Sequence, residues 1–62
     1  MNMIDAIAAL RVRLAKAQAD RDIWRVAGLH EQYLAAYFLV EALQLQIEQR
    51  LLQADPTDHE HR

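Results

Sequence analysis

Few residues of this sequence could carry out catalysis, because the usual nucleophiles are nearly absent. There is no Cys and no Ser, and the single Thr is Thr57, beside Pro56. A nucleophilic enzyme needs such a side chain next to a general base. Asp20 and Asp22 could act as paired carboxylates, but capping of a helix end at a turn explains them better. We therefore expect that the protein is not an enzyme.

Metal binding is the other chemistry that the sequence suggests. His59, Glu60 and His61 alternate two imidazoles with a carboxylate near the C-terminus. Structural zinc sites use four ligands held by a fold, and this segment supplies neither a Cys nor a third His. The remaining histidine, His30, falls between apolar positions, and we interpret it as structural. The sequence also lacks a Gly-rich loop for phosphate. We expect no cofactor and no metal.

Apolar residues recur with helical spacing along most of the chain. Only one Gly and one Pro are present, and no stretch alternates as a strand does. Asn2 is a suitable N-cap. The spacing predicts a first helix over about residues 3–19, whose apolar stripe comprises Met3, Ile7, Leu10, Leu14 and Ala17.

A second helix is predicted over about residues 23–54. Asp20 and Arg21 would form the turn, and Asp22 would cap the new helix. We interpret Gly28, inside this helix, as a point of close approach to the first helix. Pro56 disfavours continuation, so 55–62 is predicted to be a polar, disordered tail. The apolar stripe comprises Val26, Leu29, Tyr33, Ala36, Val40, Leu43 and Ile47.

These lengths predict an all-α domain over residues 1–54, an antiparallel hairpin with a longer second helix. At 1.5 Å per residue the helices would span roughly 25 Å and roughly 48 Å, so the first would cover the second only to about Val40. Another chain would have to cover the rest, and we expect a homodimer that forms a four-helix assembly. The predicted dimer interface comprises Leu43, Leu45, Ile47, Leu51 and Leu52.

A second stripe on the long helix suggests a further partner. Around the helix axis, this stripe is rotated by more than about 100° from the first stripe. It comprises Leu34, Phe38, Leu45 and Leu52, interleaved with Glu31, Glu41 and Glu48. Aromatic side chains are common at interfaces. The residues predicted to bind a heterologous protein are Leu34, Tyr37, Phe38 and Trp24. We expect an adaptor or inhibitor that occupies a surface of a larger protein, and the competing class is a purely structural oligomerisation module.

Charge and composition bear on location and source. The net charge is −2 and the pI is about 5.8. We expect no signal peptide and no membrane span, and a chain without Cys gives no sign of an oxidising compartment. A cytoplasmic location is therefore expected. The preference for Arg over Lys, with abundant Ala, Leu and Gln, is typical of a GC-rich bacterial or phage genome.

Two known kinds of protein resemble this pattern. A dimer of short hairpins with an acidic tail resembles Rop-like plasmid copy-number regulators, which bind paired RNA loops. The resemblance implies RNA binding through the basic residues of 11–25, but the acidic pI favours no nucleic-acid partner. Residues 14–40 are similar to the hairpin of flagellar and secretion export chaperones. That similarity rests on Ala17, Ala19, Trp24, Val26, Leu29 and Tyr33. It implies a structural role for Trp24, which would close the hairpin over Leu14 and Ala17.

Overall fold

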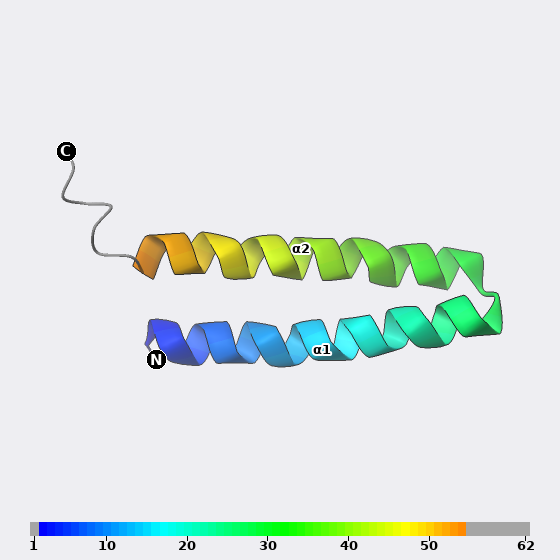
Figure 1. Cartoon of the computed structure of the whole chain (residues 1–62), viewed down its shortest axis with the longest axis horizontal. Coiled ribbons are helices and arrows are strands. Elements are labelled where there is room, and N and C mark those ends of the chain that lie inside the picture. Colours follow the sequence, from blue (N-terminus) through cyan, green and yellow to red (C-terminus); the bar gives the residue numbers. More distant parts are fainter. Residues whose placement is uncertain (1, 55–62) are drawn as a thin grey trace.

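The computed structural model describes residues 2–54, which form two antiparallel α-helices packed side by side (Figure 1). Helix α1 spans Met3–Ala27 and helix α2 spans His30–Ala54. The all-helical hairpin is therefore confirmed. Each helix has 25 residues, so the prediction of a longer second helix is wrong. The predicted tail, with His59, Glu60 and His61, lies outside the described residues.

The two ends of α1 are capped in different ways. At the start, the Asn2 side chain accepts a hydrogen bond of 2.9 Å from the Asp5 backbone N–H, as an N-cap does. At the end, Gly28 has a φ of 77°, in the left-handed region. The Gly28 N–H donates to the Arg25 carbonyl at 3.2 Å, and the Leu29 N–H donates to the Trp24 carbonyl at 3.1 Å. This pair of bonds is the Schellman arrangement that ends a helix.

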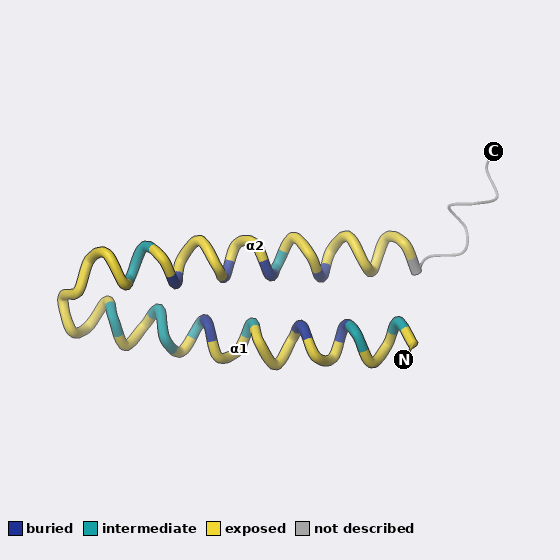
Figure 2. Tube along the Cα trace, turned by 180° about the vertical axis from the view of Figure 1, so that it is seen from behind, coloured by how far each residue is buried: buried dark blue, intermediate teal, exposed yellow. Residues whose placement is uncertain are grey.

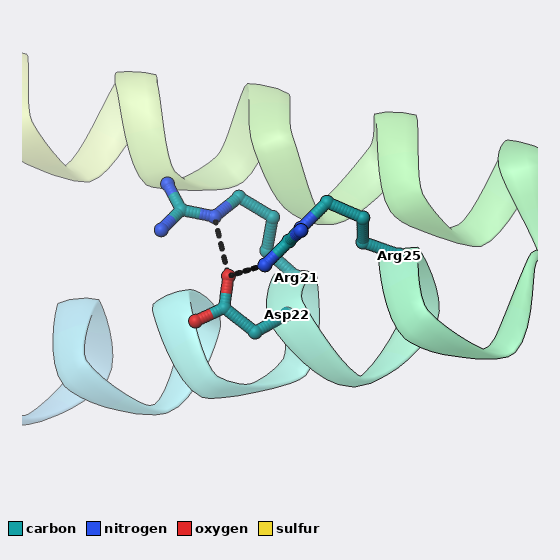
Figure 3. A network of polar contacts seen from close by, with 3 residues as sticks. All are labelled: Arg21, Asp22 and Arg25. Carbon is teal, nitrogen blue, oxygen red and sulfur yellow. Dashed lines mark hydrogen bonds and ion pairs between the residues drawn. The ribbon is translucent and has the colours of Figure 1, made fainter.

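The predicted turn at Asp20–Asp22 is wrong, because α1 continues through it. Both carboxylates find partners on the helix surface. Asp20 accepts a hydrogen bond of 2.9 Å from Lys16. The Oδ1 atom of Asp22 lies 3.4 Å from Nε of Arg21 and 3.8 Å from Nη2 of Arg25 (Figure 3). The Lys16–Asp20 and Asp22–Arg25 pairs have the i,i+4 and i,i+3 spacings that support a continuous helix.

The turn lies instead at Gly28, where backbone conformation explains the glycine. A Cβ added to Gly28 would meet no atom within 4 Å, so our interpretation as a close approach between helices is wrong. The left-handed conformation costs a residue with a side chain about 1–2 kcal/mol. Glycine avoids this cost, and its position makes the two helices equal in length.

The core lies along the seam where the two helices face each other (Figure 2). Val40 and Leu43 are each only 1% exposed. The buried cluster comprises Ile7, Leu10, Ala17, Val40, Leu43 and Ile47, with Met3 and Leu14 packed against it. Both predicted seam stripes are thus confirmed over these positions. Val26 departs from the prediction: it belongs to α1 and is 81% exposed.

Equal helix lengths also change the predicted dimer interface. Leu43 and Ile47 are covered by α1 of the same chain, so no second chain is needed to bury them. Leu45, Leu51 and Leu52 remain exposed. The Cα trace measures 49 × 23 × 12 Å. Its smallest dimension is about half of its width, as two helices lying side by side give. Within the described residues the hairpin is therefore a single layer, with an uncovered outer face on each helix.

Candidate protein-interaction surface

Aromatic rings form a continuous row along the first half of α2. The ring centroids of His30 and Tyr33 are 6.4 Å apart, and those of Tyr33 and Tyr37 are 6.1 Å apart. The Tyr37 and Phe38 rings meet edge to face at 5.9 Å, with an interplanar angle of 85°. These distances lie in the favourable range for aromatic pairs. The row leads from half-buried Tyr33, beside the seam, to Phe38, which is 64% exposed.

Phe38 belongs to the outer face of α2, which we call the acidic face. From the helical rotation per residue, its apolar positions fall within about 40° of one another and about 160° from the seam. Phe38, Leu45 and Leu52 are all more than half exposed, while Leu34 is half-buried. The acidic face comprises Leu34, Phe38, Leu45 and Leu52 with the exposed carboxylates Glu31, Glu41 and Glu48.

A hollow of about 430 Å³ lies on the acidic face between two of its carboxylates. Leu45 and Ala42 supply its apolar lining, and Glu41 and Glu48 stand at its ends, two helical turns apart. Gln44 completes the lining. The site therefore combines an apolar surface with negative charge, which suits a side chain that has an aliphatic stem and a cationic end.

The four residues predicted to bind a partner do not form one continuous surface. Leu34 and Phe38 share the acidic face, whereas Tyr37, the residue before Phe38, points to another side of the helix. Trp24 lies at the turn, half-buried on α1. It lines a hollow of about 270 Å³ together with Arg25, Gly28, His30 and Tyr33. The structure thus separates a turn end around Trp24 from the outer face of α2.

The outer face of α1 is a second apolar surface, which we call the mixed-charge face because Asp5, Arg11, Lys16 and Asp22 flank it. It comprises Ile4, Ala8, Val12, Ala15, Ala19, Ile23 and Val26, on the side of the helix opposite to the seam. Val12 is 71% exposed, and Ile4 and Val26 are more exposed still. The predicted first helix, which ended at about residue 19, contained only the part of this face from Ile4 to Ala19. The same spacing continues through Ile23 and Val26, across the predicted turn, and this continuation was the signal that α1 is longer.

The basic residues of α1 do not all share a face, although Arg21 and Arg25 both lie beside Asp22. Arg11 and Arg13 are two positions apart, which places them on nearly opposite sides of a helix. Lys16, Arg21 and Arg25 each pair with an aspartate of the same helix. Phosphate recognition uses cations that converge on one surface. This arrangement does not favour the RNA-binding alternative.

Metal and membrane features are also absent from the part of the chain that is described. Within residues 2–54, no three side chains of His, Asp or Glu come together closely enough to hold a metal ion. Neither α1 nor α2 has a stretch sufficiently long and apolar to cross a membrane.

Comparisons with known proteins give no relative. No protein-family model, no curated protein and no solved structure matches the chain. The two outer faces and their side chains are therefore the features of the molecule that point to a function.

Proposed function

We propose that this protein is a small non-enzymatic adaptor or inhibitor, which acts as a dimer of helical hairpins and occupies a surface of a larger bacterial protein. One observation carries the proposal: both outer faces expose large apolar side chains although the seam is already filled. Exposed apolar patches of this kind mark interaction surfaces. By analogy with small inhibitors that bacteria and phages encode, a transcription factor or a secretion ATPase is the expected type of target.

Stability supports the dimer. A single core in a domain below roughly 70–80 residues supplies only about 3–5 kcal/mol, and such domains usually add a disulfide, a metal or a partner chain. Disulfides are excluded because the chain has no Cys. A second copy that covers one outer face would bury further apolar surface and form a four-helix assembly.

The mixed-charge face suits this second copy better than the acidic face does. The apolar residues of this face have nearly the same spacing whether the helix is followed from its N-terminus or from its C-terminus. An antiparallel copy centred on Ala15 therefore places apolar residues opposite apolar residues. The opposed pairs are Ile4 with Val26, Ala8 with Ile23, and Val12 with Ala19. Small residues allow close approach, and a two-fold axis requires a self-complementary surface. Pairing two acidic faces would instead bring carboxylates together in parallel register, or bury them against apolar side chains in antiparallel register, and both are unfavourable.

Sedimentation velocity at micromolar concentration tests the dimer. We expect the wild type to sediment as a dimer and Val12→Lys as a helical monomer or a partly unfolded chain. Leu45→Lys, a matched change on the acidic face, should remain dimeric. A wild type that sediments as a well-folded monomer would rule out the dimer. Dissociation by Leu45→Lys alone would move the interface to α2.

A further inference from the structure

We infer that the acidic face binds a basic amphipathic helix of the target protein. This inference rests on the proposed function and gives the target its chemistry. Phe38, Leu45 and Leu52 recur every seven residues, and so do Leu34, Glu41 and Glu48. Together the two series have the alternating 4 and 3 spacing of a coiled-coil seam. The natural occupant of such a surface is therefore another helix.

The charges of the acidic face determine which kind of helix it can bind. On the acidic face, Glu41 and Glu48 take positions that apolar residues occupy in a simple coiled coil. A parallel second copy would place carboxylates opposite carboxylates, which is repulsive, and an antiparallel copy would bury Glu41 and Glu48 against apolar side chains without a partner, which is also unfavourable. A helix with Lys or Arg at the facing positions would instead form pairs. Arg50, the only Lys or Arg of α2, lies two positions after Glu48, on another side of the helix, and does not neutralise this face.

The hollow shows how one such cation would sit. Leu45 and Ala42 line it between Glu41 and Glu48, with about 430 Å³ of space. A Lys or Arg stem can lie along the apolar lining while its charged end reaches a carboxylate. Phe38, one turn before Glu41 and held edge to face by Tyr37, offers the apolar anchor. Specificity would come from charge, and anchoring from the ring.

Two designed peptides of three heptads serve as probes. The basic peptide carries Leu at one core position of each heptad and Lys at the other, with Ala and Gln elsewhere. The acidic peptide replaces each Lys with Glu. Labelled peptides are titrated with the full chain at physiological salt, and fluorescence anisotropy reports binding. We expect the basic peptide to bind at least about tenfold more tightly, a difference of about 1.4 kcal/mol. The preference should shrink as salt rises.

Matched double variants distinguish binding at the acidic face from attraction by the net charge of the protein. Glu41→Gln with Glu48→Gln should abolish the preference for the basic peptide. Asp5→Asn with Asp20→Asn removes the same number of charges from α1 and should leave the preference intact. Circular dichroism verifies that each variant stays helical. If the preference survives in the glutamate variant, or falls equally in both variants, the inference is overturned.

Two further outcomes distinguish the inference from the proposed function. If the wild type is a dimer and neither peptide binds, the inference fails while the dimer stands. If Leu45→Lys dissociates the dimer, a second copy occupies the acidic face, and the inference fails as well. Sedimentation of the wild type without any peptide shows separately whether the dimer forms.

Discussion

Leu43 and Leu45 stand two residues apart on α2, yet Leu43 is 1% exposed and Leu45 is 54% exposed. Both belong to helically spaced apolar stripes, and the side chains are chemically identical. The difference is that α1 covers the seam, whereas the described chain has nothing to lay over the acidic face. Apolar character therefore does not decide which stripe becomes the core. The position of the neighbouring helix decides it.

The two outer faces differ from each other in a second way. On α1, large apolar residues are interspersed with alanines, and both signs of charge flank them. On α2, larger apolar residues alternate with carboxylates of one sign. A self-complementary surface fits the first pattern, and a partner of opposite charge fits the second. One hairpin can in this way offer separate faces to its own copy and to a target.

The largest expected effect compares the two leucines directly. Leu43→Ala removes a fully buried side chain and should cost about 2–5 kcal/mol of unfolding free energy. Leu45→Ala, at an exposed position, should change it by about 0.5 kcal/mol or less. Urea unfolding at low protein concentration measures both values. Equal losses in the two variants would mean that the acidic face is also covered.

The next largest expected effect is on target binding, and it compares neighbouring residues on different faces of α2. Phe38→Ala should weaken capture of a target protein by about 2 kcal/mol or more, roughly 30-fold, because it removes an exposed aromatic anchor. Tyr37→Ala should weaken it too, since the Tyr37 ring holds Phe38 edge to face. Leu39→Ala is the control, exposed on another side of α2. Helicity should persist in all three variants.

The Phe38 prediction has a clear contrary outcome. If Phe38→Ala and Leu39→Ala retain the target equally, the partner surface lies elsewhere. The turn end around Trp24 and its hollow would then be the next surface to test.

The smallest expected effect concerns the turn that sets the seam. Alanine is strained at the φ of 77° that Gly28 adopts. Gly28→Ala should therefore lower the unfolding free energy by about 1 kcal/mol. Gly28→Asn should lose less, since asparagine tolerates this conformation. Thermal unfolding measures both. An alanine variant as stable as the wild type would argue against a turn at this residue.

Local patterns made much of the fold predictable. Asn2 is an N-cap as expected, since capping depends only on the next few residues. The seam positions of both helices were correct wherever the predicted helix was correct, because helical spacing fixes which side chains share a face. The acidic face was likewise visible in the spacing of Leu34, Phe38, Leu45 and Leu52 with its glutamates.

The turn was not predictable from the same local rules. The stretch around Asp20 and Asp22 offers good caps for a new helix. The same carboxylates also pair with Lys16 and Arg25 at the i,i+4 and i,i+3 spacings of a continuous helix. Gly28 is compatible with a helix interior at a modest cost or with a left-handed cap. Because short-range energies are so evenly matched, packing of the two helices decides between these alternatives.

The sequence by itself therefore determined that the chain is helical and that each helix carries an apolar seam stripe, since backbone chirality and side-chain spacing act locally. Only the tertiary structure decided that the chain turns at Gly28, that Leu43 and Ile47 lie inside the hairpin, and that the two outer faces stay uncovered. Turning at Gly28 makes the helices equal in length, so α1 covers the apolar stripe of α2 as far as Ile47.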